Sequence, residues 1–247
     1  MRCLIYFFLS LVALGGVETG QAFEIPANCG QLITGVAKSW DDSEVLLQRW
    51  IRQEDGVWKA SGTPWPGRLG SSGLAWGLGL HPADLPGIRK VEGDKRAPAG
   101  VFRLGNAYGY APDVLRLPAL PYTQITESDL WVEDVKSPYY NHHIKLEGRG
   151  PQNEWERQAQ MRLNDPAHAL KLFIGHNPPP HVVPGAGSAI FFHIWRRNGE
   201  AATSGCTVMD EDQLKSLIAW VNPAKNPLYV LLPESVYNQM RSAWRLP

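Results

Sequence analysis

Short segments of alternating apolar and polar residues, separated by turn residues, recur along this chain. Residues 31–36 (QLITGV) and 44–52 (EVLLQRWIR) show the period of two that is typical of half-buried strands, and Asp55-Gly56 then marks a hairpin turn into residues 57–59. The 24 Gly and 20 Pro provide many turns and disfavour a helical bundle. The sequence therefore predicts a mainly β fold with a few helices.

Two helices interrupt this pattern in the second half of the chain. Residues 153–163 are rich in helix formers and end before Pro166. Residues 210–221 begin at Asp210, a good N-cap, and carry an apolar stripe at helical spacing. Further strands are expected at residues 74–76, 170–174, 188–194 and 228–232.

Residues 1–22 have the composition of a cleaved secretory signal. Arg2 precedes an apolar run over residues 3–17, and small residues then lead to Ala22, where we expect cleavage. The remaining residues 23–247 are expected to form a single domain that is periplasmic or secreted. An uncleaved anchor is the alternative, although the run is shorter than the ~20 apolar residues that span a bilayer. The mature chain has no other apolar stretch of spanning length, so no transmembrane segment is expected there.

The charge balance excludes one class of partner. The 24 Lys and Arg residues equal the 24 Asp and Glu residues, so the formal net charge is zero. A neutral chain lacks the broad basic face that binds nucleic acid, and no nucleic-acid partner is expected. Three Cys residues are too few for a disulfide scaffold, and Cys29 and Cys206 remain after the expected cleavage. A disulfide between these two is one interpretation, and a free Cys206 kept for chemistry is the other.

The surroundings of Cys206 favour chemistry. An apolar strand ends in His193, a polar loop follows, and the turn Ser204-Gly205-Cys206 leads toward the second expected helix. A thiol and an imidazole brought together in this way form a nucleophile and base, since the imidazole can take the thiol proton before the thiolate attacks a carbonyl. The N–H groups around Gly205 and Cys206 are candidates to hold the developing oxyanion. Two buried core residues are the alternative.

These residues resemble a known family. The segment from His193 to Cys206 resembles the signature of the YkuD-type L,D-transpeptidases, in which a His, a spacer and Ser-His-Gly-Cys follow one another. Residues 92–104 resemble the family's Gly…Thr-Pro-x-Gly-x-Phe segment, with Ala97 in place of Thr. In a stand-alone branch of the family, segments similar to residues 137–141 and 182–188 also occur.

The resemblance covers about residues 31–233 and implies a β-sandwich-like catalytic domain that forms a cysteine acyl-enzyme without a cofactor. It implies peptidoglycan stem peptides as substrate, cleaved after the L-centre of diaminopimelate at position three. Carried over to this sequence, Cys206 is the nucleophile and His193 the general base. The family's orienting carbonyl, just after the histidine, would belong to Ile194 or Trp195.

Two positions depart from the family pattern. Ser204 stands where a second His is usual, and Val208 stands where an Arg is often found two residues after the Cys. Arg196 and Arg197 lie between His193 and Cys206 and are candidates to supply the missing positive charge to substrate. A solvated pair of loop residues is the alternative.

Three further residues are candidate substrate contacts. Tyr140 and Asn141 are expected near the cleft by resemblance, and His176 follows a strand that could line the cleft opposite the histidine base. A loop-stabilising role is the alternative for His176. No metal site is expected, because the chain has no His-x-x-x-His or Cys-x-x-Cys spacing.

The sequence thus predicts an exported cysteine acyltransferase of the L,D-transpeptidase type. An enzyme that hydrolyses the same bonds, as L,D-carboxypeptidase, endopeptidase or amidase, is equally compatible with the residues. The outcomes differ only in whether an acceptor amine or water attacks the acyl-enzyme. From a different class, a non-catalytic domain that binds cell wall or glycan is the alternative.

Overall fold

A computed structural model describes residues 23–247, and the predicted signal segment at residues 1–22 lies outside the described residues. The strands are β1 (Gln31–Ala37), β2 (Glu44–Arg52), β3 (Trp58–Ala60), β4 (Trp65–Arg68), β5 (Leu74–Trp76), β6 (Ala97–Gly109), β7 (Tyr122–Gln124), β8 (Asp129–Trp131), β9 (His143–Lys145), β10 (Leu170–Ile174), β11 (Phe191–Ile194), β12 (Thr207–Met209) and β13 (Leu228–Pro233). The α-helices are α1 (Glu154–Gln158), α2 (Glu211–Trp220) and α3 (Glu234–Met240), and the 3-10 helices are η1 (Pro166–His168), η2 (Arg197–Gly199) and η3 (Pro223–Lys225). The mainly β fold predicted from the sequence is confirmed.

The main sheet closes on itself. Its strands follow the order β1-β13-β6-β10-β11-β12-β4-β2-β3, and β1 also pairs with β2, so the path from β1 round to β2 has no free end. Closure removes the exposed strand edges that promote aggregation. The interior is filled by apolar side chains from facing strands, such as Leu32, Leu47, Phe102, Phe192 and Tyr229.

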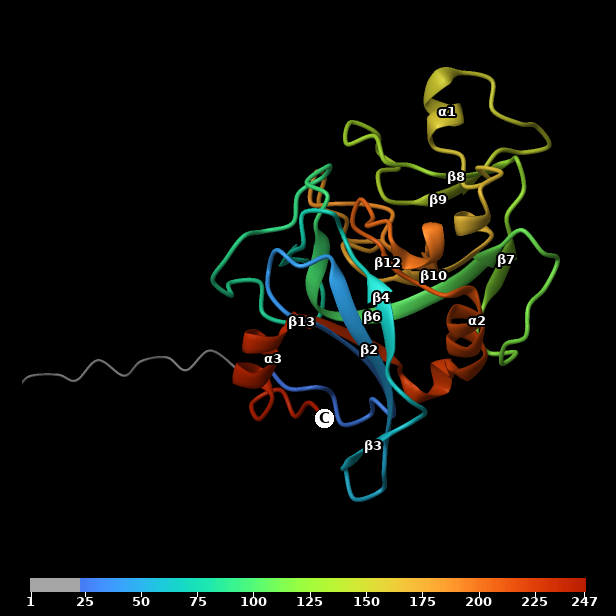
Figure 1. The fold of residues 1–247 in the computed structure, drawn as a ribbon. Coiled ribbons are helices and arrows are strands. Elements are labelled where there is room, and N and C mark those ends of the chain that lie inside the picture. Colours follow the sequence, from blue (N-terminus) through green and yellow to red (C-terminus); the bar gives the residue numbers. More distant parts are fainter. Residues whose placement is uncertain (1–22) are drawn as a thin grey trace, which may run out of the picture.

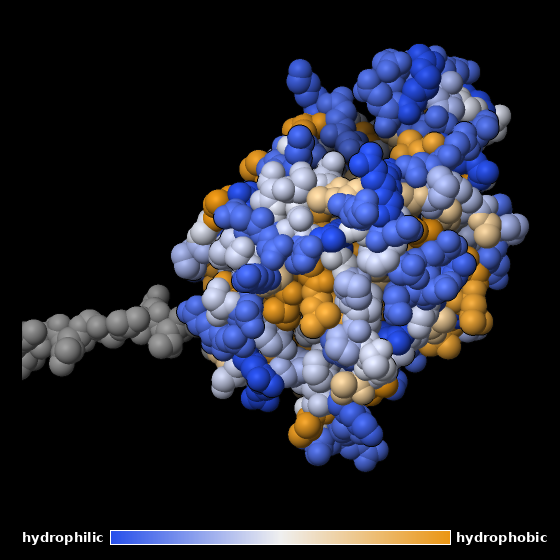
Figure 2. All heavy atoms as spheres, in the orientation of Figure 1, coloured by the Kyte–Doolittle hydropathy of each residue, from blue (hydrophilic) through white to orange (hydrophobic). Residues whose placement is uncertain are grey.

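The remaining elements surround this sheet (Figure 1). The short pair β8–β9 lies with α1 at one end of the molecule, and the β2–β3 hairpin projects from the opposite end. Helix α2 lies against β11 and buries Leu214, Leu217 and Ile218. Figure 2 shows that the α1 end is mostly hydrophilic, whereas a small hydrophobic patch lies over β2, where Leu46 is exposed.

Local sequence signals explain most boundaries. Asp210 caps α2 by accepting the N–H of Asp212, as the sequence predicts. The helix predicted at residues 153–163 is wrong in length, because α1 ends at Gln158. Beyond it, the chain pairs with β8 instead: Ala159 accepts the Trp131 N–H, and the Met161 N–H is donated to Asp129. These tertiary hydrogen bonds replace those of a helix that is too short to be stable alone.

Two more expectations are corrected by backbone geometry. The strand predicted at residues 188–194 begins only at Phe191, because Ala189 has a positive φ of 55° that no strand accommodates. The region of residues 62–79, expected to contain one strand, contains both β4 and β5.

None of the helices in residues 23–247 is long and apolar enough to cross a membrane.

Candidate active site

Strand pairing brings His193 and Cys206 together. Strands β11 and β12 are parallel, with Phe192 opposite Thr207, and Cys206 immediately precedes β12. Cys206 therefore lies level with Phe191, whose N–H donates to Sγ at 3.4 Å. Phe191 and His193 are two residues apart on one strand and so project from the same face. The imidazole and the thiol consequently line the same cleft.

The imidazole of His193 is fixed in one tautomer. Nδ1 lies 2.9 Å from the carbonyl oxygen of Ile194 and 3.1 Å from that of Ala167. Both partners are acceptors, so Nδ1 carries the proton and Nε2 is left as the basic nitrogen. The orienting carbonyl expected just after the histidine is therefore that of Ile194. Burial lowers the pKa of His193 to about 4, so the ring is neutral at pH 7.

The thiol of Cys206 is free and partly exposed to the cleft. Its Sγ–H donates to the carbonyl of Ala189 at 3.4 Å, and burial raises the pKa of the thiol to about 11. Cys29 is also free; it is fully buried and donates to the carbonyl of Gln31 at 3.2 Å. The possible disulfide between the two cysteines is therefore not formed. At pH 7 the Cys206 thiol and the His193 imidazole are therefore both neutral.

Thr203 shapes the turn that carries the thiol. Its Oγ1 accepts the Gly205 N–H at 3.0 Å and donates to the Cys206 carbonyl at 2.7 Å. Gly205 has φ of 151°, and a Cβ on it would lie 3.0 Å from the Arg96 carbonyl oxygen, so only glycine fits without strain. The predicted role of the Gly205 N–H in holding an oxyanion is not supported, because Thr203 already binds it. The Cys206 N–H remains the candidate donor, and Ser204 is exposed on the cleft wall.

The cleft has a volume of about 290 Å³ and is lined by groups of both charges. His168, His193 and Arg196 lie close together, and Lys90 and two carboxylates, Glu92 and Glu133, also line the cleft. The full lining consists of Lys90, Glu92, Glu133, His168, Ser188, Ala189, Ile190, His193, Arg196, Thr203, Ser204, Gly205 and Cys206.

Arg196 is held in place at the cleft. Its Nε lies 3.1 Å from Oδ2 of Asp165, its Nη2 binds the same oxygen, and Nη2 lies 3.0 Å from Nε2 of His168. Since His168 stacks on His193 with ring centres 4.8 Å apart, Arg196 is linked to the base through one intervening ring. Arg197 is exposed in η2 and does not line the cleft, so its predicted substrate contact is not supported.

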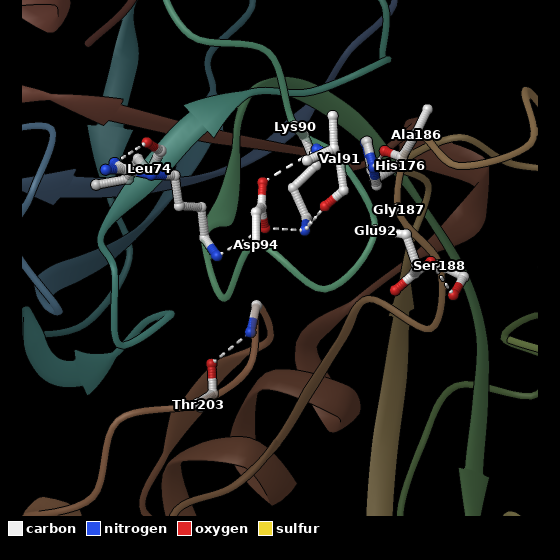
Figure 3. A network of polar contacts seen from close by, with 12 residues as sticks. Leu74, Lys90, Val91, Glu92, Asp94, His176, Ala186, Gly187, Ser188 and Thr203 are labelled. Atoms are coloured by element: carbon white, nitrogen blue, oxygen red, sulfur yellow. Dashed lines mark hydrogen bonds and ion pairs between the residues drawn. The ribbon is translucent and has the colours of Figure 1, made fainter. Parts of the chain in front are cut away.

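Asp94 organises the loop that precedes β6. Its Oδ1 pairs with Nζ of Lys90 and accepts the Arg96 N–H at 2.9 Å, while Oδ2 accepts the Val91 N–H at 3.0 Å (Figure 3). The buried Lys90 stem passes close to the catalytic turn, since a Cβ on Gly205 would lie 3.8 Å from Lys90 Cε. The loop before β6 and the thiol turn are therefore packed as one unit.

Tyr140 binds the loop before β6 through Glu92 and does not line the cleft. It is 2% exposed, and its Oη donates to Oε2 of Glu92 and accepts the Gly187 N–H at 3.1 Å. Glu92 Oε2 also accepts from Oγ of Ser188 at 2.7 Å, a contact visible in Figure 3. The predicted substrate contact of Tyr140 is not supported, because its hydroxyl is buried in these bonds.

Asn141 is likewise a structural residue. It is fully buried with φ of 57°, and its Oδ1 accepts the N–H of Ala189 and Nε1–H of Trp131, both at 2.9 Å. Its Nδ2 donates to the Asn177 carbonyl at 2.6 Å. It therefore fixes Ala189, whose carbonyl accepts the hydrogen bond of the Cys206 thiol. The predicted direct contact of Asn141 with substrate is not supported.

His176 also acts away from the cleft wall. Its Nδ1 accepts the Leu78 N–H at 3.0 Å and its Nε2–H donates to the Ala186 carbonyl at 2.9 Å. Burial lowers the pKa of His176 to about 4. It ties two loops together, so the loop-stabilising alternative describes its position and the predicted substrate contact is not supported.

The sequence did not predict several residues in the cleft, such as Glu92 and Glu133, or close to it, such as Asp165 and Lys171. Glu92 lies inside a segment that resembles the family but has no distinguishing pattern of its own, and Glu133 and Asp165 carry no local signal. Lys171 could have been found, because it is a lone charge within the apolar strand LKLFI. Among residues 23–247, no group of three or more His, Cys, Asp or Glu side chains is placed to hold a metal ion.

This closed, mainly β domain has a half-buried thiol and a carbonyl-oriented imidazole in one cleft, the two groups that cysteine-dependent acyl transfer requires. The model of the YkuD family, the L,D-transpeptidase catalytic domain, matches residues 67–230. The chain belongs to this family, whose members are cysteine-dependent enzymes that modify peptidoglycan. None of the curated proteins matches the chain.

Proposed function

We propose that this chain is an exported L,D-transpeptidase, with Cys206 as its nucleophile and His193 as its base. The substrate is a peptidoglycan stem peptide that carries diaminopimelate followed by D-Ala. The single observation that carries the proposal is the His193 tautomer, which leaves a basic Nε2 in the same cleft as a free thiol. The signal-like residues 1–22 support export to the periplasm or the exterior, where the polymer lies.

The first half-reaction is acyl transfer to sulfur. Nε2 of His193 takes the thiol proton, and the thiolate attacks the carbonyl carbon between diaminopimelate and D-Ala. The resulting oxyanion is held by backbone N–H, for which that of Cys206 is the candidate. The imidazolium then returns the proton to the departing amine, so free D-Ala leaves and a Cys206 thioester remains. Protons and charge balance over this half-reaction.

The second half-reaction decides the activity. If an amine of a second stem peptide attacks the thioester, His193 takes a proton from it, the thiol is restored and a crosslink forms. If water attacks, the product is a shortened peptide and the chain is a hydrolase. The partial exposure of Cys206 to an open cleft supports access by either nucleophile, and we favour the amine because the family is that of transpeptidases.

The charged walls support recognition of an amino-acid-like substrate. Arg196, held by Asp165, is positioned to bind a substrate carboxylate, such as the one on the terminal D-Ala. The cleft also presents Glu92, whose Oε2 is already bound by Tyr140 and Ser188. A peptide bearing both charges would thus be oriented across Cys206.

Product analysis tests this function. Purified protein is incubated with disaccharide-tetrapeptide and the products are identified by mass. A dimer crosslinked between two diaminopimelate residues is expected, and a tripeptide alone would assign the hydrolase instead. No product from the wild-type chain would overturn the stem-peptide substrate and would favour the non-catalytic binding domain.

A further inference from the structure

A buried lysine lies on the strand beside His193. Lys171 of β10 is 5% exposed and stands directly opposite His193 in the antiparallel β10–β11 ladder, as Phe173 stands opposite Phe191. Cross-strand partners lie on the same face of a sheet, with Cβ atoms about 5 Å apart. The lysine therefore belongs to the same layer of side chains as the imidazole.

The ammonium of Lys171 has little around it to neutralise its charge. Nζ makes one long hydrogen bond, 3.5 Å to the Met161 carbonyl, and lies 5.5 Å from the centre of the Phe191 ring. Within residues 23–247, Lys171 forms no ion pair with a carboxylate. A buried charge without a partner is costly, so its presence is not explained by stability.

The same neighbours connect Lys171 to the thiol. The Phe191 ring lies beneath the ammonium, and the Phe191 N–H donates to Sγ of Cys206 at 3.4 Å. Met161, which accepts the hydrogen bond from Nζ, belongs with Phe191 to the apolar cluster against which Cys206 packs. Phe191 thus faces the ammonium with its ring and contacts the sulfur with its backbone N–H, and charges in apolar surroundings interact strongly.

Nearby charged groups shift the pKa values of Lys171 and of the Cys206 thiol. Burial lowers the pKa of Lys171 to about 8, and Cys206, Glu133 and Asp165 act in the opposite direction. The positive charge of Lys171 lowers the pKa of the Cys206 thiol, which burial holds at about 11, and Glu133 raises it. Other titratable or cationic groups near these side chains, among those in residues 23–247, include His168, His193, Arg196 and Lys90.

We propose that Lys171 is the counter-charge of the Cys206 thiolate, a positioning residue that acts through its charge without touching substrate. This inference rests on the proposed role of Cys206 as nucleophile. When the thiol proton passes to His193, Lys171 stays protonated, stabilises the thiolate and disfavours the imidazolium. Because the positive charge of Lys171 disfavours the imidazolium, that ring gives its proton readily to the leaving amine. The effect is present while Lys171 is charged and is lost as the pH rises through its pKa.

The rate of alkylation of Cys206 by iodoacetamide, measured against pH, tests this role without any peptide substrate. Peptide mapping assigns the label to Cys206 instead of the buried Cys29. K171M and K171Q are expected to slow the reaction at pH 7 by about tenfold or more, since one pKa unit is a factor of ten in thiolate. K171R, which keeps the charge, is expected to stay within about threefold of the wild type at pH 7. K59M, a change on the exposed β3 hairpin, is the matched control and is expected to have no effect.

An unchanged pH profile in folded K171M or K171Q would overturn the proposal. If neither neutral variant folds, K171R provides the test, because arginine stays charged where lysine loses its proton. K171R is expected to be alkylated faster than the wild type above pH 8, and coincident profiles up to pH 10 would overturn the proposal too. Shifted alkylation profiles in a chain that fails to process tetrapeptide would refute the proposed function and leave the role of Lys171 intact.

Discussion

Nδ1 of His193 donates to the carbonyl oxygen of Ile194, the next residue in the chain, over 2.9 Å. A carbonyl in this position fixes the tautomer as a carboxylate would, but it stabilises a charged ring less. In the proposed mechanism, the imidazole is therefore a base that accepts a proton briefly and returns it.

Replacing His193 by Asn tests this role. Asn retains a donor near the Ile194 carbonyl and removes the basic nitrogen, so we expect H193N to fold and to form the thioester about 10²–10⁴-fold more slowly. Single-turnover kinetics with tetrapeptide give the rate, with H181N, a change at an exposed loop residue, as control. A folded H193N of wild-type rate would show that another group takes the proton.

The two neighbouring arginines differ in what they can bind. Arg196 lines the cleft beside Asp165, whereas Arg197 is exposed outside it. We expect R196A to raise KM for tetrapeptide about tenfold or more with a smaller change in kcat, and R197A to change neither. D165N is expected to give an intermediate effect, because the guanidinium loses its support. Equal effects of R196A and R197A would contradict this account.

Tyr139 and Tyr140 are adjacent in the chain but differ in burial, so Y139F is a matched control for Y140F. Y140F removes the hydroxyl that binds Glu92 and accepts the buried Gly187 N–H, so we expect the free energy of unfolding to fall by about 1–3 kcal/mol. Tyr139 is 56% exposed, and Y139F is expected to change stability by less than about 0.5 kcal/mol. Urea denaturation measures both. If Y140F instead left stability unchanged and raised KM, Tyr140 would be a substrate contact after all.

Acid should destabilise the fold through its buried histidines. Burial lowers the pKa of His81, His176 and His193 to about 4 and that of His168 to about 3, each from an ordinary value of 6.5. Between pH 6.5 and 4 the unfolded chain binds protons that the folded chain excludes, so stability falls as pH falls. Each histidine contributes a slope of about 1.4 kcal/mol per pH unit in this window. Urea midpoints at pH 7.0, 5.5 and 4.5 measure the effect, and equal midpoints would contradict the buried, neutral state.

Strong local patterns made parts of the fold predictable. The alternation in residues 44–52 and the cap at Asp210 lie within single elements, and β2 and α2 follow them. The resemblance of the segment from His193 to Cys206 to the family signature likewise pointed to two residues that share the cleft. By contrast, no local pattern predicts β6, the strand that lies between β13 and β10 in the sheet. Its 13 residues include glycines and a proline, which usually mark turns.

The cleft walls were less predictable than the pair they surround. Tyr140, Asn141 and His176 belong to segments near the site, yet whether a polar side chain faces a cleft or buries its hydrogen bonds depends on tertiary packing. Glu133 and Lys171 reach the site from segments distant in sequence, so no spacing could place them beside Cys206.

The central claim is that Cys206 carries the acyl group, and intact-protein mass spectrometry tests it most directly. Wild-type protein mixed with disaccharide-tetrapeptide and quenched in acid should gain the mass of the substrate less D-Ala, and peptide mapping should place the adduct on Cys206. C206A should show neither adduct nor product. Product formation by C206A at the wild-type rate, or an adduct on another residue, would contradict the account.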